Sequence, residues 1–371
     1  MDAGTGEPVL YIADSWNNRI RRVDKGGVIM TVAGTGTSGY DGDGGVATDA
    51  MLWSPRDVAA VANASSGSVA LFIADTGNER IRRVDEGGIM TTVAGTGSNG
   101  FFGDGGAATS AKLASPHGVA VLHNATTGRV ALFIADNWNH RIRRVDEDGV
   151  INTCAGNGSS GHSGDGGVAT DARLRSPIRV AVIRISSTGG VVLYITDSGN
   201  HCIRRVDEDG IISTVVGTGA VGSGGDGGLA TAAQLRGPRG VAVDCNSTSG
   251  SVVLYIADTS NHRIRQVDEF GVIRTVAGGK YGFNGDGGAA TDARMAYPGG
   301  VAVFRGTSGG EAVMYIANIN NHRIRRVSAL SSSPTPSPSP SSSVTATLTP
   351  RAPSASVEPH AVFRVFLQVR V

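Results

Sequence analysis

The stretch IADNWNHRIRRVD at 134–146 decides the fold, because close copies of it recur along the whole chain. The other copies read IADSWNNRIRRVD at 12–24, IADTGNERIRRVD at 73–85, ITDSGNHCIRRVD at 195–207, IADTSNHRIRQVD at 256–268 and IANINNHRIRRVS at 316–328. Their third residues, which lie 61, 61, 61, 61 and 60 residues apart, are Asp14, Asp75, Asp136, Asp197, Asp258 and Asn318. A fixed period of this length indicates an architecture of repeated units.

A second phrase has the same period. It reads GDGG, then two variable residues and Thr, and its aspartates are Asp43, Asp104, Asp165, Asp226 and Asp286. Two independent phrases that share one period make a chance match implausible. Six repeats of about 61 residues are therefore expected.

One period contains four segments of strand character. LFIAD at 71–75, RIRRVD at 80–85, IMTTVAG at 89–95 and GVAVL at 118–122 are short and rich in β-branched residues. Turn residues separate them, and helical periodicity is lacking. The strands are nearly continuously apolar, which is typical of sheets covered on both faces. The sequence predicts an all-β fold, a six-bladed β-propeller of four-stranded antiparallel blades.

The strand count leaves the ring two strands short. The chain enters at the second strand of the first blade and leaves at the third strand of the sixth, which gives 22 strands instead of 24. AVFRVFLQVRV at 361–371 alternates like a strand and could fill one gap; the alternative is a shortened chain. We expect a propeller over 1–329, a disordered Ser/Pro/Thr-rich linker or stalk over 330–360, and a short β-like tail over 361–371 that closes the ring.

These phrases resemble a known family. The succession of SP-x-GVAV, LFIAD, NHRIRRVD, TVAG and GDGG-x-AT is similar to the NHL-repeat β-propellers over residues 9–328. The Asn-His-Arg tripeptide itself stands at 139–141, 261–263 and 321–323. The resemblance implies a closed propeller, often of six blades. It also implies single-stranded RNA binding as one alternative function, because some members bind RNA.

Composition narrows the function classes. The chain has 371 residues with 55 glycines, and 33 basic residues nearly balance 32 acidic ones. A net charge of +1 argues against nucleic-acid binding by bulk charge. The cysteines, Cys154, Cys202 and Cys245, show no disulfide framework and no metal-ligand spacing.

The repeated polar residues are interpreted as structural anchors. The aspartate that ends each IAD is expected to accept backbone N–H groups of the following turn, whose Asn tolerates left-handed geometry. The GDGG aspartate is expected to bond inside a tight glycine turn rather than to hold calcium, because only the first copy offers a second carboxylate, Asp41. The RIRR blocks hold 16 of the 30 arginines, which we interpret as paired or blade-bridging. The turn histidines, His140, His201, His262 and His322, are too far apart to share a metal.

Positions that break the repeat are more informative about function. Directly after the repeated proline stand Arg56-Asp57, His117, Arg179 and Arg239, just before the strand that lines the channel of a propeller. We predict that Arg56, Asp57, His117, Arg179 and Arg239 form a binding site at one mouth of the channel.

The chain also resembles propeller lyases that act on amidating-peptide intermediates. These place a metal-binding His directly after such a proline in several blades. Here only His117 fits, and Arg56, Ile178, Arg239 and Gly299 take the other places. The resemblance therefore does not supply a metal-ligand set.

Four sequons mark candidate N-glycosylation sites: Asn63, Asn124, Asn157 and Asn246. They favour an extracellular location, whereas Met1-Asp2-Ala3-Gly4 shows no signal peptide, which favours the cytoplasm. The sequence leaves both open. No apolar run approaches the ~18 residues of a membrane-spanning helix, so no transmembrane segment is predicted.

The leading hypothesis is a non-enzymatic scaffold that binds a protein, or a glycan, through its loop faces. A metal-dependent propeller enzyme, either a lyase or a lactonase-like hydrolase, is one alternative, and single-stranded RNA binding is the other. The expected partner is a protein, nucleic acid is disfavoured, and the chain is expected to be a monomer. No cofactor or metal is predicted.

Overall fold

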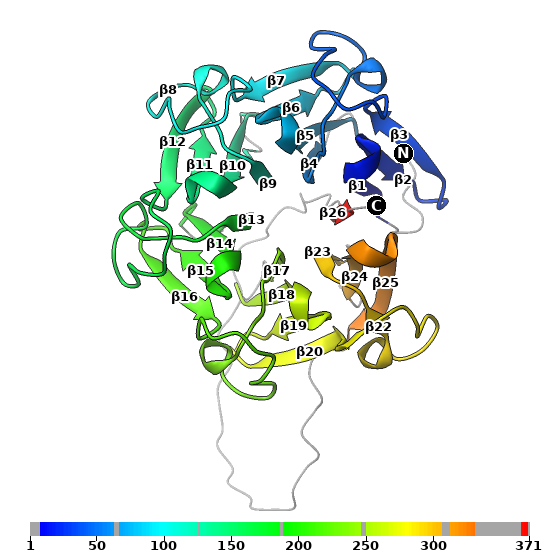
Figure 1. The fold of residues 1–371 in the computed structure, drawn as a ribbon, viewed down its shortest axis with the longest axis vertical. Helices are drawn as coiled ribbons and strands as arrows, with labels where there is room; N and C mark the ends of the chain where they lie inside the picture. The colour runs from blue at the N-terminus through cyan, green and yellow to red at the C-terminus, as the bar shows by residue number, and fades with distance from the viewer. Residues whose placement is uncertain are drawn as a thin grey trace, which may run out of the picture.

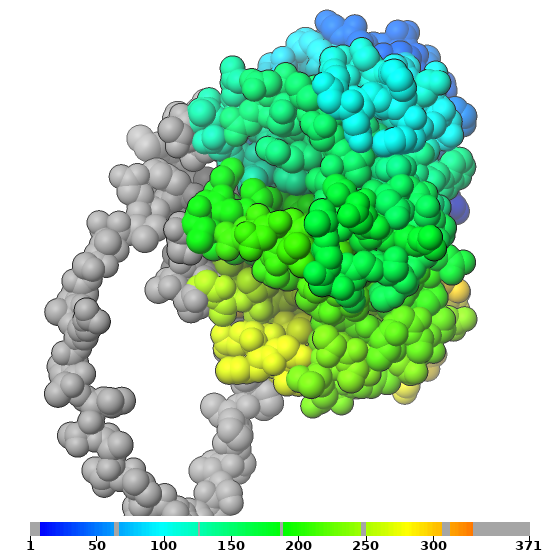
Figure 2. Space-filling view, turned by 90° about the vertical axis from the view of Figure 1, so that its left-hand side faces the viewer, coloured from blue at the N-terminus to red at the C-terminus, as the bar shows by residue number. Residues whose placement is uncertain are grey.

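Six β-sheets are arranged around one axis (Figure 1) in the computed structural model, which describes residues 8–62, 67–124, 127–185, 188–245, 250–305, 312–330 and 365–369. The six-bladed all-β propeller predicted from the repeats is confirmed. Figure 2 shows the rim of the disc, where the middle repeats follow one another in chain order.

Four blades have the full set of strands, which follow one another from the axis outward. Blade two holds β4 (Asp57–Ala62), β5 (Val69–Asp75), β6 (Arg80–Val84) and β7 (Met90–Ala94). Blade three holds β9 (Pro116–His123), β10 (Val130–Asp136), β11 (Arg141–Val145) and β12 (Val150–Ala155). Blade four holds β13 (Pro177–Arg184), β14 (Val191–Asp197), β15 (Cys202–Val206) and β16 (Ile212–Val216). Blade five holds β17 (Gly240–Cys245), β18 (Val252–Asp258), β19 (Arg263–Val267) and β20 (Ile273–Gly278).

Blades one and six are the incomplete ones predicted by the strand count. Blade one contributes β1 (Leu10–Asp14), β2 (Arg19–Val23) and β3 (Ile29–Ala33). Blade six contributes β23 (Pro298–Phe304), β24 (Ala312–Asn318) and β25 (Arg323–Leu330). Within the described residues, no strand pairs with the outer edge of β25.

The tail predicted at 361–371 contains β26 (Val365–Val369), which pairs with β1 near the axis (Figure 1). It takes the innermost place of blade one, but its pairing is parallel, unlike the antiparallel pairs of the blades. The linker predicted at 330–360 lies outside the described residues, except that Leu330 ends β25. The domain boundaries stay predictions.

Short elements complete the described chain. β8 (Gly106–Ala107), β21 (Lys280–Tyr281) and β22 (Arg294–Met295) are two-residue strands in the glycine-rich loops. Single 3₁₀ turns follow the second strand of each blade: η1 (Ser15–Asn17), η3 (Thr76–Asn78), η5 (Asn137–Asn139), η6 (Ser198–Asn200), η8 (Thr259–Asn261) and η10 (Ile319–Asn321). Others lie in the glycine-rich loops: η2 (Ala47–Asp49), η4 (Ala108–Ser110), η7 (Ala230–Ala232) and η9 (Ala290–Asp292).

The core lies between blades rather than inside them. One cluster joins Phe72 and Ile81 of blade two to Leu132 and Ile134 of blade three, with Leu113 of the connecting loop. Each of these side chains is at most 3% exposed. Because both faces of a blade are covered in this way, its strands are apolar without alternation.

The aspartate that ends each second strand is buried, but its partners differ from the prediction. The 3₁₀ turns that follow Asp75 and Asp136 have no side-chain cap, so the expected bonds from turn N–H groups are not made there. Instead Asp136 Oδ1 accepts the N–H of Ala114, 22 residues upstream, at 2.7 Å, and Oδ2 accepts Asn139 Nδ2 at 2.8 Å. The left-handed residue is also not the turn Asn but the next one, such as His140 with φ 54°.

In blades two to six, a buried arginine joins the blade to the GDGG loop of the preceding repeat. Arg143 on β11 is fully buried, and Nη2 lies 2.6 Å from Asp104 in the GDGG loop of the preceding repeat. Its Nη1 lies 3.3 Å from Asp136 of its own blade. The same arrangement joins Arg82 to Asp43 and Asp75, Arg204 to Asp165 and Asp197, and Arg265 to Asp226 and Asp258. Each of these arginines therefore balances the charge of one aspartate in its own blade and one in the loop of the preceding repeat.

The two carboxylates around Arg82 have pKa values shifted in opposite directions. Burial raises the pKa of Asp75 and Asp136 to about 6, although both accept hydrogen bonds that oppose the shift. Asp43 behaves differently: burial opposes ionisation, but hydrogen bonds from Thr92 and Tyr40 and the charge of Arg82 hold its pKa below the usual value. Asp43 therefore stays ionised to a lower pH than Asp75 as a counter-ion of Arg82.

Replacing the bridging arginine should be far more costly than replacing its exposed neighbour. In Arg143→Leu, Asp136 would stay buried without its counter-charge, a type of change that costs about 3–5 kcal/mol. Arg144 is exposed on the same strand, so Arg144→Leu should change stability by no more than about 0.5 kcal/mol. Urea denaturation of both variants measures the difference, and equal losses would contradict the bridging role.

Candidate binding site at the channel mouth

Three of the five predicted site residues meet in one pocket. Arg56, His117 and Arg239 follow the repeated proline in blades two, three and five, and they line a cavity of about 200 Å³. Ile178 of blade four completes the series, and Ser115, Asn137 and Trp138 form the rest of the wall. The repeated proline stands at the start of the innermost strand, and the strand order is the same in every blade. The proline loops therefore all lie on one face of the disc, which we call the mouth face.

The other two predicted residues do not line this pocket but pair with each other. Arg179 Nε donates to Asp57 Oδ2 at 3.2 Å, and Nη2 donates to Oδ1. Asp57 also accepts the N–H groups of Val58 at 3.0 Å and Val119 at 3.1 Å. Both side chains are buried. The pair therefore ties the innermost strands of blades two, three and four together across the channel.

Gly118 makes room for this ion pair. A Cβ at position 118 would lie 2.6 Å from the Ile178 carbonyl oxygen and 3.0 Å from the Arg179 Cα. Both distances are too short for a side chain at this position without a backbone shift. Blade three, which lies between the blades of Asp57 and Arg179, thus has a glycine, Gly118, at this position.

Thr196 is a functional neighbour that the sequence interpretation missed. It replaces the Ala of the other IAD copies. Its hydroxyl accepts the N–H of Arg179 at 2.8 Å and lies 3.3 Å from the carbonyl oxygen of Arg239. The difference from Ala in the other repeats could have indicated this residue, because it places a polar group at a buried position.

The pocket contains two guanidinium groups that have no counter-ion among the described residues. Neither Arg56 nor Arg239 forms a side-chain hydrogen bond or ion pair with the part of the chain that the structure describes, and Nε of Arg56 is fully buried. Burial lowers the pKa of Arg239, yet a guanidinium stays charged at neutral pH. Two unbalanced positive charges therefore face one cavity.

His117 adds a neutral ring to the pocket. Its Nδ1 lies 2.8 Å from the Ser115 carbonyl oxygen. Because a carbonyl only accepts, Nδ1 carries the proton and Nε2 is left with a lone pair. Burial, reinforced by the charge of Arg239, lowers the pKa of His117 to about 4 although the Ser115 bond opposes the shift. The positive charge at neutral pH is thus supplied by the arginines alone.

Aromatic side chains surround the pocket on the mouth face. Trp138 is 64% exposed and Trp53 is 51% exposed. Large and small residues alternate between the loop before the proline and the 3₁₀ turn: Trp53 covers Gly77, whereas Trp138 stands opposite Ala114. The indole of Trp53 thus packs on Gly77, and both tryptophans remain largely exposed to solvent.

The turn histidines serve as contacts between blades. The Nδ1 atoms of His140, His201 and His262 accept the N–H groups of Ser176, Gly237 and Tyr297 in the next repeat, at 3.2, 3.1 and 3.3 Å. Over the described ranges, no group of three or more His, Cys, Asp and Glu side chains is placed to hold a metal ion. The three cysteines are free thiols.

Most of the repeated arginines are engaged in the same way. Arg141 packs over the Phe101 ring at 3.7 Å and donates to the Asn157 carbonyl oxygen at 2.7 Å, while Arg143 is the buried bridge. Arg144 alone of this block is exposed. A continuous ring of free arginines is therefore not formed by these blocks.

Two of the predicted sequons can be placed. Asn124 is half-buried and its Nδ2 donates to Glu147 at 3.0 Å, whereas Asn157 is exposed and donates to the Asp171 carbonyl oxygen at 3.0 Å. Asn63 and Asn246 lie outside the described residues. In the described part of the chain, no helix has both the length and the apolar character needed to cross a membrane.

Comparison with known proteins agrees with the repeat phrases. The profile of the teneurin NHL domain matches residues 157–224 and 219–283. NHL repeat-containing protein 2 of Gallus gallus is 28% identical over 340 residues, which cover 85% of this chain and 44% of the relative. The chloroplastic protein SUPPRESSOR OF QUENCHING 1 of Arabidopsis thaliana is 30% identical over 272 residues, covering 70% of this chain and 24% of the relative. The chain spans less than half the length of these curated relatives.

Solved structures share the fold at low identity. An auxiliary nutrient binding protein from Bacteroides thetaiotaomicron superposes with a TM-score of 0.55 at 18% identity, covering 87% of this chain and 69% of that one. The repeat phrases, the six blades and the curated relatives agree: this chain belongs to the NHL-repeat family of β-propellers.

Proposed function

We propose that this propeller is a non-enzymatic scaffold that binds a protein partner at its mouth face, where the pocket receives an acidic side chain or a terminal carboxylate. The observation that carries the proposal is the pair of guanidinium groups, Arg56 and Arg239, that face one cavity without a counter-ion among the described residues. An anion that enters the pocket would supply the missing charge and would accept charge-assisted hydrogen bonds.

The size of the pocket favours a side chain over a free small molecule. Its volume is about 200 Å³, below the roughly 300–1,000 Å³ of typical small-molecule sites. The surrounding face is wide and carries exposed Trp138 and Trp53, the residue type most enriched among interface hot spots. A macromolecule could cover this face and place one carboxylate in the centre.

The alternatives find less support in these side chains. A glycan could stack on the tryptophans, but it would leave the two arginines without an anion unless it were acidic. A metal-dependent enzyme would need a ligand set, and the pocket offers one imidazole beside two guanidiniums. RNA binding would need free arginines, and those of the repeat phrases are largely engaged. The similar nutrient binding protein supports the fold alone, so the proposal rests on the pocket.

Removing either pocket arginine should weaken binding of an acidic peptide. The probe is a fluorescein-labelled Gly-Ser-Gly-Glu-Trp-Glu peptide with a free carboxylate, and its control carries Gln for Glu and an amidated end. A hydrogen bond to a charged group contributes about 1.5–3 kcal/mol, so Arg56→Ala and Arg239→Ala should each weaken binding roughly 10- to 100-fold. Fluorescence anisotropy at low and physiological salt measures the affinity.

Arg144→Ala is the matched control for this experiment, because it removes an exposed arginine away from the pocket. It should leave the affinity within about twofold of the wild type, since it changes only a long-range charge that salt screens. Equal weakening by all three substitutions, or equal binding of the neutral peptide, would contradict a specific carboxylate site.

The low pKa of His117 should appear in the stability of the protein. In the unfolded chain His117 binds a proton below its ordinary pKa of 6.5, whereas in the folded protein it does so only near pH 4. Between these values the unfolded state binds more protons, so acidification favours unfolding. The stability advantage of the wild type over His117→Asn should shrink as the pH falls from 6.5 towards 4 and stay constant above 6.5. Urea denaturation across this range tests it, and an advantage that grows on acidification would show a charged, stabilising His117.

A further inference from the structure

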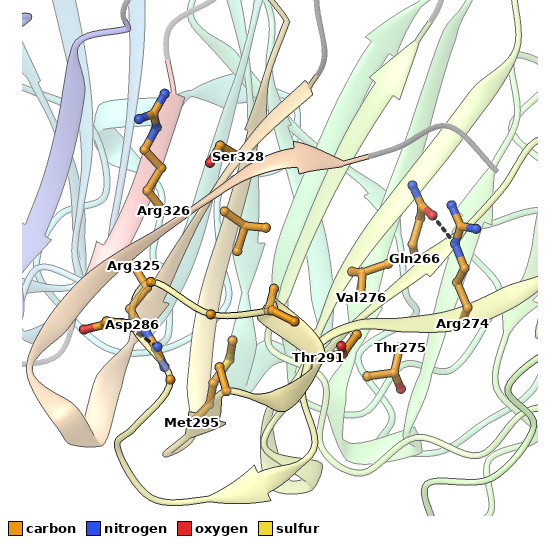
Figure 3. Close-up of a pocket in the computed structure, with 17 residues that line it drawn as sticks. Gln266, Arg274, Thr275, Val276, Asp286, Thr291, Met295, Arg325, Arg326 and Ser328 are labelled. Atoms are coloured by element: carbon orange, nitrogen blue, oxygen red, sulfur yellow. Dashed lines mark hydrogen bonds and ion pairs between the residues drawn. The ribbon is translucent and has the colours of Figure 1, made fainter. Parts of the chain in front are cut away.

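Blade six has a groove along its outer edge. A cavity of about 690 Å³ lies between β25, the end of blade five and the fifth GDGG loop, and Asp286, Met295, Arg325 and Ser328 are among its lining residues (Figure 3). In the other blades this place belongs to the outermost strand. The groove shares no lining residue with the mouth pocket, so binding in it does not rest on the proposed function.

The complete blades show what the loop normally holds. In the first repeat, Gly44 N–H donates to the Met90 carbonyl at 2.7 Å, and Ala47 N–H donates to the Gly88 carbonyl at 2.8 Å. In return, Met90 N–H donates to the Gly45 carbonyl at 2.9 Å. The loops at 166–169 and 227–230 make the same three bonds to β16 and β20 or to the turns before them. Each loop therefore fixes the outer strand of the next blade through its backbone.

The fifth loop has the same groups but no strand to hold among the described residues. Gly287 N–H, Ala290 N–H and the Gly288 carbonyl make none of these bonds within the described chain. Their geometry is nonetheless that of the other copies: Gly285 and Gly287 have φ 91° and 83°, close to the 85° and 83° of Gly42 and Gly44. The loop thus has the geometry of its counterparts without a strand partner among the described residues.

Asp286 lacks, within the described chain, a strand partner that its counterparts have. In blades two and three the loop aspartate also accepts a threonine hydroxyl of the outer strand: Thr92 donates to Asp43 and Thr153 to Asp104, both at 2.6 Å. Asp286 keeps its bridge to Arg325 at 2.5 Å (Figure 3), but its side chain is 67% exposed, against 34% for Asp104. A threonine acceptor is therefore open in the groove.

The five outer strands define what fits. They read IMTVA at 29–33, MTTVA at 90–94, INTCA at 151–155, ISTVV at 212–216 and IRTVA at 273–277. In each, an Ile or Met comes first and a Thr third. The Thr lies opposite the arginine at the third position of the neighbouring strand, as Thr92 lies opposite Arg82. Arg325 is the equivalent residue of β25.

We propose that the groove of blade six binds an extended segment of a partner protein with the pattern Ile/Met-x-Thr-Val-Ala. The segment pairs antiparallel with β25, accepts hydrogen bonds from the loop at 287–290 and donates one to it, and places its threonine against Asp286. This is β-strand addition, in which backbone bonds give affinity and side-chain pockets give specificity. A partner strand is inferred because, among the described residues, the five outer strands are held in their own sheets and β26 pairs with β1.

A peptide copied from the chain itself tests the proposal. Fluorescein-labelled GGIMTTVAG, the sequence of residues 87–95, is titrated with the full chain by fluorescence anisotropy. Saturable binding is expected. A control peptide, GGIMTVVAG, lacks only the threonine hydroxyl that would reach Asp286 and should bind at least about fivefold more weakly.

Two substitutions locate the binding on the protein. Ala290→Pro removes one donor of the loop, and Ala289, with φ −61° and ψ 133°, already has the conformation required before a proline. It should weaken binding at least about tenfold. Asp286→Asn should reduce the preference for the threonine peptide, because a neutral amide oxygen is a weaker acceptor than a carboxylate. The matched variant Asp165→Asn, in a blade with its own outer strand, should leave the preference unchanged. Circular dichroism confirms that each variant is folded.

Failure of GGIMTTVAG to bind the full chain would overturn the proposal, including the case in which another segment of this chain already fills the groove. Binding that is unchanged in both Ala290→Pro and Asp286→Asn would overturn it as well, because the peptide would then sit elsewhere.

Discussion

The ring depends on guanidinium groups that are buried between repeats. Arg82, Arg143, Arg204 and Arg265 are fully buried, and each lies between an aspartate of its own blade and one in the preceding loop. A buried charge without a partner is strongly unfavourable, so a blade can bury its arginine only when the neighbouring loop is in place. Arg21 of blade one shows the converse: it has no such loop among the described residues and is 27% exposed. Electrostatics thus add to apolar packing a reason why neighbouring blades form together.

Because the repeated residues make the contacts between blades, the positions that differ between repeats are not constrained by those contacts. Those after the proline alternate along the innermost strand, since successive side chains of a strand point to opposite sides. Arg56 and His117 face the mouth pocket, whereas Asp57 and Arg179, one place further on, form the buried pair across the channel. The ion pair fixes the strands beneath the same loops that carry the unbalanced arginines. The rigid ring can therefore keep two like charges near one cavity, an arrangement that a flexible loop would relax.

Much of the architecture could be predicted from the sequence because the repeat phrases are strong and local. The six blades, the 22 strands and the two incomplete sheets follow from counting. The partners of the repeated side chains could not be predicted in this way. The Asp136 carboxylate reaches Ala114, 22 residues upstream, and Arg143 reaches Asp104, 39 residues upstream, and such contacts leave no local pattern. The candidate site was predicted from the positions that differ between repeats. Its division into a pocket and an ion pair has another cause: successive side chains of a strand, such as Arg56 and Asp57, point to opposite sides. Thr196 and the exposed Trp138 were missed because neither belongs to the proline loop, and only the closed ring brings them beside it.

The mouth pocket and the groove of blade six use different chemistry because they arise from different parts of the repeat. The mouth pocket is made of side chains at positions where the repeats differ. The binding proposed for it therefore depends on charge and shape, and a single substitution such as Arg239→Ala should change it without affecting the ring. The groove of blade six is made of the repeat itself, chiefly of backbone groups in the loop at 287–290 and of Asp286. The binding proposed for it is therefore limited to what every outer strand provides: an extended backbone, an aliphatic side chain and one hydroxyl.

A ring of near-identical units has such an edge wherever one sheet is a strand short. The loop beside this edge is held by Arg325 in the same geometry as its counterparts in the complete blades. The loop that borders the groove therefore has the required conformation without a bound strand. Less conformational entropy is then lost on binding, which favours tight binding by a short segment.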